Sequence, residues 1–228
     1  MEPTEFIEKN YTLEPENPTG NPRVIKGMNR DSLYQLFTKL GYKVGCEVGL
    51  EKGKNAVQMF DNIPGLKLYG VDPYKQHSQC NYAYVAEMRK WDEHYLNGCK
   101  KQALNRMTGR NFELLQDFSE DAAKKVEYNS LDFVYIDGDH SYDMAMLDVI
   151  LWGQRVKKGG IISGHDYYYD KNKEGRRAKV TQAINDYAKV HGLQFFITDE
   201  DHYVRKGDVY PSWIFVKLED IYPNVVGF

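Results

Sequence analysis

The chain has 228 residues, 42% of them hydrophobic, with a formal net charge of −3 and a pI near 6.1. This length suits one α/β domain with a sizeable core, and the composition is not that of a disordered chain. The small acidic excess argues against a general nucleic-acid binder, which carries a strong basic excess. The three cysteines lie far apart without a CxxC pair, so we expect neither a disulfide framework nor a zinc site.

Neither a secretory signal nor a membrane span is visible in the sequence. The N-terminus lacks the apolar stretch of a secretory signal, and no apolar run approaches the length that spans a bilayer. We therefore expect a soluble cytoplasmic protein that does not contact membranes. Residues 1–29 carry four prolines among polar residues, which predicts an irregular N-terminal arm, either loosely ordered or laid across a single domain over residues 30–228.

The predicted elements of that domain alternate in type. Asn29 or Asp31 can cap a first helix, which ends at Gly41. The predicted strands are 44–50, 66–71, 112–115, 131–136, 161–163, 193–198 and 212–216. The predicted helices between them are 54–60, 82–107 with a break near Gly98, 119–126, a helix capped by Ser141 that stops at Gly159-Gly160, and 179–190. This alternation predicts a doubly wound α/β fold with a parallel sheet.

Ligands of such a sheet bind beyond the carboxyl ends of the strands, so the residues after each strand matter most. After the first strand comes Glu47-Val48-Gly49-Leu50-Glu51-Lys52-Gly53. Against the dinucleotide pattern GxGxxG, Glu47 and Lys52 replace two of the three glycines. The Glu47 carboxylate would repel a pyrophosphate and favour a ligand with an ammonium and a sulfonium, such as S-adenosylmethionine. An ordinary strand-to-helix turn explains the same residues equally well.

The next two strand ends offer groups for a nucleoside. Asp72 lies nineteen positions after Gly53, near the spacing at which an acid accepts hydrogen bonds from ribose hydroxyls, and Tyr74 could cover the adenosine. Asp117 and Phe118 after the third strand could bind an adenine amino group and pack against its ring. A turn-forming Asp-Pro, a loop aromatic and a helix cap are the alternatives without a ligand.

The fourth and fifth strands end in the densest polar clusters. Asp137-Gly138-Asp139-His140 follows the buried run 131–136, and His165-Asp166 follows the next strand. Because these strand ends are neighbours, Asp137, His165 and Asp166 should converge. They could hold a hard or borderline cation, or form a base with its orienting acid.

Five segments in order resemble class I S-adenosylmethionine-dependent methyltransferases: E-x-G-x-x-x-G, V-D-P-Y, L-L-Q-D-F, I-D-G-D-H-S-Y and G-G-I-I-S-G-H-D-Y. They are most similar to a small bacterial and phage-type group with I-D-G-x-H and G-G-x-x-x-x-H-D-Y signatures, related to metal-assisted sugar O-methyltransferases. The resemblance runs from Asp31 to Val216. It implies a Rossmann-like, mostly parallel seven-stranded sheet with helices on both faces and an antiparallel last strand inserted beside the fifth.

The resemblance also implies roles for residues at the strand ends. Glu47, Gly49 and Gly53 would hold the methionine end of the cofactor, Asp72 the ribose, and Asp117 with Phe118 the adenine. Asp137 would lie beside the transferred methyl group. Two positions depart from the pattern: Gln116 stands where many relatives have glycine, and His165 where the magnesium-using sugar enzymes have an acid. An imidazole is a poor Mg²⁺ ligand but suits Mn²⁺ or iron.

Methyl transfer from a sulfonium is an in-line displacement, so alignment should supply most of the catalysis. A hydroxyl acceptor must also lose its proton. Either a metal (Mg²⁺ or Mn²⁺) on Asp137, His165 and Asp166 lowers its pKa, or His140 or His165 acts as general base. In the alternative without a catalytic histidine, His140 merely packs over the cofactor and His165 is a loop residue.

The acceptor itself is expected under two less regular segments. Tyr167-Tyr168-Tyr169 precedes Lys171, Lys173, Arg176 and Arg177, and the stretch 82–110 adds Arg89, Lys90, Lys100, Lys101 and Arg106. Aromatic rings beside cations suit a sugar, a glycosylated metabolite or an anionic acceptor, whereas single cations usually belong to solvated faces. An NAD-dependent sugar reductase and a non-catalytic cofactor-binding module are the alternative functions, and the sequence leaves a homodimer open.

Overall fold

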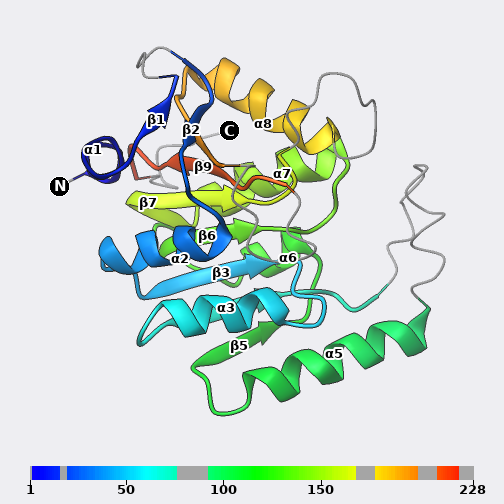
Figure 1. Cartoon of the computed structure of the whole chain (residues 1–228). Helices are drawn as coiled ribbons and strands as arrows, with labels where there is room; N and C mark the ends of the chain where they lie inside the picture. The colour runs from blue at the N-terminus through cyan, green and yellow to red at the C-terminus, as the bar shows by residue number, and fades with distance from the viewer. Residues whose placement is uncertain (1, 16–19, 76–91, 168–177, 200–209, 221–228) are drawn as a thin grey trace.

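The computed structural model describes residues 2–15, 20–75, 92–167, 178–199 and 210–220 (Figure 1). Within these residues, nine strands form one sheet in the order β1-β2-β8-β9-β7-β6-β3-β4-β5. The strands are β1 (Leu13–Glu14), β2 (Arg23–Ile25), β3 (Val44–Val48), β4 (Lys67–Val71), β5 (Phe112–Leu115), β6 (Leu131–Ile136), β7 (Val156–Gly164), β8 (Phe196–Thr198) and β9 (Trp213–Val216). The helices are α1 (Pro3–Asn10), α2 (Arg30–Lys39), α3 (Lys54–Asn62), α5 (Glu93–Met107), α6 (Ser119–Ala123), α7 (Tyr142–Gly153) and α8 (Ala178–His191).

The centre of the sheet is parallel. β5, β4, β3, β6 and β7 pair in parallel, while β9 lies antiparallel between β7 and β8. Chain order reverses where β3 lies between β4 and β6, which makes this the switch point at which α/β sheets bind ligands. All seven strands expected from the sequence are present, and the antiparallel strand lies beside the fifth, as the resemblance implied.

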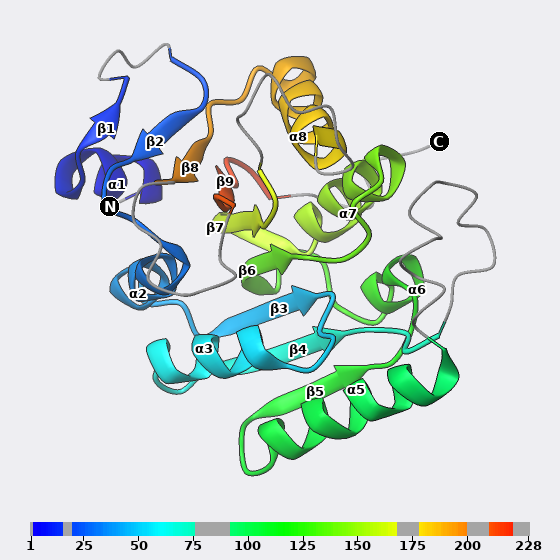
Figure 2. The same cartoon turned by 45° about the vertical axis from the view of Figure 1, so that its right-hand side comes forward.

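Helices cover both faces of this sheet (Figures 1 and 2). α2, α3 and α5 belong to one hydrophobic cluster, and α7 and α8 belong to a second cluster on the other face. β6 is buried at every position because it is covered on both sides, which is why its sequence, LDFVYI, is almost continuously apolar. The doubly wound fold class is therefore confirmed.

The N-terminal segment corrects an expectation. Residues 1–29 are not an irregular arm throughout, because α1, β1 and β2 lie within them, and β2 pairs in parallel with β8. These two strands raise the count from the expected seven to nine. The buried Arg23 in β2 also pairs with Glu8 of α1 at 2.6 Å. Strands of two and three residues between prolines show no periodicity, so sequence patterning could not reveal them.

Two boundaries also differ from expectation. α5 passes through Gly98 without a break and starts at Glu93, with Asp92 as its N-cap, whereas 76–91 lie outside the described residues. α7 ends at Gly153, and Gly159-Gly160 lie inside β7 rather than at a helix end. β7 has a register shift there, and a side chain at Gly160 would come within 2.5 Å of the Asp132 carbonyl. These glycines therefore allow the irregular pairing between β7 and β6.

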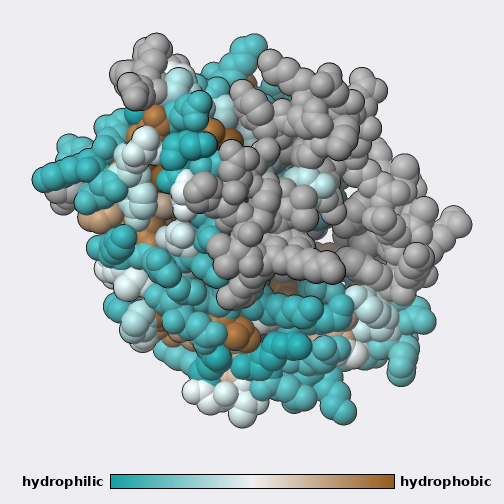
Figure 3. Space-filling view, viewed as in Figure 1, coloured by the Kyte–Doolittle hydropathy of each residue, from teal (hydrophilic) through white to brown (hydrophobic). Residues whose placement is uncertain are grey.

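No helix within the described part of the chain is long and apolar enough to cross a membrane. On the face shown in Figure 3, the described surface is mainly hydrophilic and its hydrophobic residues lie in small separate areas.

Candidate functional site

The candidate site lies at the switch point, where the loops after β3 and β6 meet. The Asp137 backbone N–H donates to the Val48 carbonyl at 2.7 Å. A Cβ atom at Gly49 would lie 2.0 Å from the Asp137 carbonyl oxygen, and Gly49 has φ of +92°. Position 49 therefore requires glycine for two reasons: its backbone conformation and the close approach of the loop after β6.

Glu47 is the buried acid of this site. It lies in β3 with 1% of its surface exposed, and its Oε1 accepts a hydrogen bond from Asn55 Nδ2 at 2.8 Å. Its Oε2 is also buried but has no hydrogen-bond partner among the described residues. Burial raises the pKa of this carboxyl to about 8, and the Asn55 hydrogen bond offsets part of that effect. A buried acceptor without a partner is costly, so this oxygen fits a cationic ligand.

Asp72 is held in a fixed orientation after β4. One oxygen accepts from the Glu51 N–H at 2.9 Å and the other from the Tyr74 N–H at 2.8 Å. The Tyr74 hydroxyl donates in turn to the Glu51 carbonyl at 2.9 Å, and its ring is 4% exposed and belongs to the apolar core. Tyr74 thus braces the loop that carries Asp72, which explains its position in the sequence without a ligand.

The other expected cofactor residues lie along the same edge. Gly53 caps α3 with φ of +68°, and its Cβ position is 3.2 Å from Ala103 of α5, so it also permits close helix packing. Phe118 is the N-cap residue of α6 and is half-buried. Asp117 pairs with Lys125 at 2.6 Å, which leaves one carboxylate oxygen outside that ion pair.

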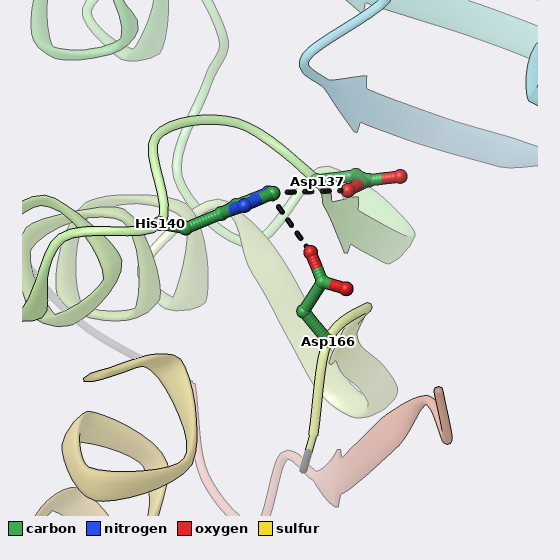
Figure 4. A group of neighbouring side chains, drawn as sticks. All are labelled: Asp137, His140 and Asp166. Atoms are coloured by element: carbon green, nitrogen blue, oxygen red, sulfur yellow. Dashed lines mark ion pairs between the residues drawn. The ribbon is translucent and has the colours of Figure 1, made fainter. Parts of the chain in front are cut away.

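The side chains after β6 and β7 converge around one imidazole (Figure 4). His140 Nε2 lies 3.6 Å from Asp137 Oδ1 and 3.0 Å from Asp166 Oδ2. His165 Nδ1 lies 3.9 Å from Asp137 Oδ1 and 3.3 Å from Asp166 Oδ1. The structure therefore brings together all four of these residues. Asp137, His140 and Asp166 each offer a ligand atom within 4.8 Å of the others, so among the described residues His140 stands in this group of three where the sequence predicted His165.

Charge pairing shapes the protonation of this cluster. Burial opposes ionisation of Asp137, but His165 and His140 outweigh it and lower the pKa of Asp137 to about 2. The pKa of Asp166 is lowered in the same way, again against burial. For His140, burial works against the charged form, but the two carboxylates prevail and raise its pKa. Two carboxylates are thus held ionised at neutral pH.

Sequence reasoning missed two site residues. Arg30, at the start of α2, places its guanidinium 4.0 Å from Asp137 Oδ2. Asn55, in the first turn of α3, contacts Glu47. Neither belongs to a strand-end motif, so both became visible through tertiary contacts alone.

The expected acceptor segments are only partly described. Tyr167 is 1% exposed and donates to Asn185 at 2.9 Å, so it is a core residue rather than an acceptor contact. Tyr168, Tyr169, Lys171, Lys173, Arg176, Arg177, Arg89 and Lys90 lie outside the described residues. Lys100 donates to Gln116 at 2.6 Å, and Arg106 donates to the Lys52 carbonyl at 2.9 Å. Arg106 thus supports the loop after β3.

The sheet order and the inserted antiparallel β9 form the Rossmann-like fold of class I S-adenosylmethionine-dependent methyltransferases. A family model described as a methyltransferase domain matches residues 46–167, just over half of the chain. The chain belongs to this methyltransferase family, and its fold class and enzyme class agree with the resemblance seen in the sequence. We found no curated protein with significant sequence similarity to the chain.

Solved structures share the fold at low identity. The O-methyltransferase TomG from Streptomyces achromogenes, in complex with S-adenosylmethionine, has a TM-score of 0.57 and 11% identity over 82% of this chain and 78% of that one. An O-methyltransferase from Bacillus cereus, in complex with S-adenosylhomocysteine, has a TM-score of 0.57 and 12% identity over 94% and 87%. A spermidine synthase from Thermotoga maritima has a TM-score of 0.53 and 13% identity over 86% of this chain and 61% of that one. The fold is therefore shared by enzymes with different names, so the acceptor must be argued from the site.

Proposed function

We propose that the protein transfers the methyl group of S-adenosylmethionine to a hydroxyl oxygen of a small acceptor, such as a sugar or glycosylated metabolite. The observation that carries this proposal is the group of Asp137, His140 and Asp166 at the switch point, beside the loop of the buried Glu47. A hydroxyl must be deprotonated to become a good nucleophile, and this group of acids and an imidazole can supply that step, whereas a neutral amine is nucleophilic without it.

The residues along the strand ends fit the cofactor. Glu47, Gly49 and Gly53 would hold its methionine end, Asp72 its ribose, and Asp117 with Phe118 its adenine. Glu47 Oε2, which has no hydrogen-bond partner in the part of the chain that the structure describes, supports the first assignment, since an ammonium would satisfy it. The cofactor supplies a methyl group activated on a sulfonium. The protein's own contribution is to align donor and acceptor and to keep Asp137 ionised near the positive charge.

A divalent metal fits the acidic group. Asp137, His140 and Asp166 would be its ligands, with His165 next to them. Two carboxylates and an imidazole suit Mn²⁺ or iron better than Mg²⁺. Such an ion would lower the pKa of an acceptor hydroxyl. The competing role is general base: His140, with Asp166 orienting it, would then take the acceptor proton directly.

The test is a screen for S-adenosylhomocysteine release with sugars, phenols and amino sugars, with and without chelator. We expect release with at least one hydroxylated acceptor and its loss after chelation. Single His140→Ala and His165→Ala variants, assayed in the same way, distinguish the roles. Activity that survives chelation but disappears in one histidine variant would overturn the metal assignment. Release confined to amines lacking hydroxyls would overturn O-methylation.

We also propose that residues 30–228 form the methyltransferase domain, with the N-terminal segment added to one edge of its sheet. The parallel pairing of β2 with β8 supports this arrangement.

A further inference from the structure

A chain of three polar side chains runs from α2 to the buried acid of the site. The Tyr34 hydroxyl donates to Asn55 Oδ1 at 2.6 Å, and Asn55 Nδ2 donates to Glu47 Oε1 at 2.8 Å. Tyr34 is fully buried in α2 and packs edge-on against Tyr135 of β6. Its hydroxyl therefore has a fixed place, and the half-buried Asn55 is the link between that hydroxyl and Glu47.

This geometry fixes which way the Asn55 amide points. The pKa of the Tyr34 hydroxyl is raised, mainly by burial, so the hydroxyl keeps its proton and donates it. The Asn55 carbonyl oxygen must accept this proton, which turns the Asn55 NH₂ group towards Glu47. An NH₂ group can only donate, so it pairs with one carboxylate oxygen and stabilises the ionised form. The other oxygen, Oε2, is left buried without a partner in the described structure.

We propose that Asn55 is a positioning residue, held by Tyr34, which commits one Glu47 oxygen to the protein and leaves the other for the ammonium group of the methyl donor. This inference rests on the proposed function, since it concerns the same cofactor. Without Asn55, the carboxylate of Glu47 would lose its donor and could rotate about its side-chain bonds. Affinity for the methionine end of the cofactor would fall, while affinity for its nucleoside end would not.

Two ligands distinguish binding of the methionine end of the cofactor from binding of its nucleoside end. S-adenosylhomocysteine carries both the nucleoside and the amino-acid part, whereas 5′-methylthioadenosine carries the nucleoside without the ammonium. Calorimetry with the full chain at pH 7.5 gives a dissociation constant for each. The test variant is Asn55→Leu, which has nearly the same shape but neither donor nor acceptor. The matched control is Asn62→Leu, which changes a half-buried asparagine of the same helix whose amide bonds to Gln58 and Gln35.

We expect Asn55→Leu to weaken S-adenosylhomocysteine binding roughly 10- to 100-fold, the usual effect of losing a hydrogen bond to a charged group. Binding of 5′-methylthioadenosine should stay within twofold, and Asn62→Leu should change neither. In a Glu47→Gln background, Asn55→Leu should add less than a further twofold, because it acts through Glu47.

Three results would overturn the inference. They are an equal loss of affinity for both ligands in Asn55→Leu, an unchanged affinity of that variant for S-adenosylhomocysteine, or effects of Asn55→Leu and Glu47→Gln on binding free energy that add in full. A folded wild-type protein that binds neither ligand would instead overturn the proposed function, and this inference with it. Thermal unfolding of each variant shows whether it is folded. Tyr34→Phe frees the Asn55 amide to turn, so it should weaken the binding of S-adenosylhomocysteine but not that of 5′-methylthioadenosine.

Discussion

His140 Nε2 lies 3.0 Å from Asp166 Oδ2 and 3.6 Å from Asp137 Oδ1, so one imidazole nitrogen faces carboxylates from two neighbouring strand ends. Neighbouring ligands of one octahedral ion are about 3 Å apart when each metal–ligand bond is about 2.1 Å. The three side chains thus need little rearrangement to share a cation.

We predict that dialysis against a chelator lowers the methyl-transfer rate at least tenfold, and that Mn²⁺ restores it better than Mg²⁺ because a nitrogen ligand suits Mn²⁺ better. Asp166→Asn, which removes one anionic ligand, should raise the Mn²⁺ concentration for half-maximal rate roughly 10- to 100-fold. The measurement is the initial rate of S-adenosylhomocysteine release against metal concentration. A chelated enzyme with full activity contradicts the prediction.

The buried charge of Glu47 should cost stability in the absence of ligand. Its pKa is about 8 in the folded protein, above the ordinary glutamate value of 4.5, so the folded state holds its proton more tightly than the unfolded state. Stability is therefore lost as pH rises from about 4.5 to about 8. Glu47→Gln should match the wild-type melting temperature near pH 5 and exceed it by several degrees at pH 8. Equal melting temperatures at both pH values would show that Glu47 is ionised without cost.

The same carboxyl should make cofactor affinity depend on pH. Between pH 5.5 and 7.5, the dissociation constant of S-adenosylhomocysteine should fall up to about tenfold per pH unit, because its ammonium needs the ionised Glu47. Among the groups that act on Glu47, Arg30 stays charged and Asp137 has its pKa near 2, so neither titrates in this window.

The control for that measurement is 5′-methylthioadenosine, which has the ribose but not the ammonium. The pKa of Asp72 is also raised by burial, but Asp72 would affect both ligands alike. The prediction fails if the affinity for 5′-methylthioadenosine shows the same pH dependence as that for S-adenosylhomocysteine.

Much of this architecture follows from local sequence. The seven expected strands are present because runs such as LDFVYI are almost continuously apolar, and Asn29 indeed caps α2 through a hydrogen bond from the Ser32 N–H. The strand ends also located Glu47 and Asp137 at one edge of the sheet. These features depend on short-range patterns that a single sequence carries.

The remaining features depend on contacts between distant segments. β2 is a strand because it pairs with the edge of β8, although its own sequence, RVI, shows no alternation of apolar and polar residues. Arg30 reaches Asp137 across more than a hundred positions, and no spacing rule connects the two. Gly98 was expected to break a helix, yet α5 continues through it, with Leu96, Cys99 and Ala103 buried against the core on either side. Tertiary packing decided each of these cases.

Two glycines should therefore respond in opposite ways to alanine. Gly49→Ala places a Cβ atom 2.0 Å from the Asp137 carbonyl at a positive φ, so we expect a loss of several kcal/mol in stability and of S-adenosylhomocysteine binding. Gly98→Ala, in open space inside α5, should raise stability by about 0.5–1 kcal/mol without changing that binding. Urea unfolding and calorimetry measure both. A tolerated Gly49→Ala would contradict the close contact between the two loops.

Equilibrium dialysis of the folded chain against labelled S-adenosylmethionine tests the central claim, that the acids at the switch point bind this donor. We predict one molecule bound per chain with micromolar affinity, unchanged by excess NAD and strongly weakened by Glu47→Gln. An absence of binding to the folded chain, or displacement of the donor by NAD, would contradict the account.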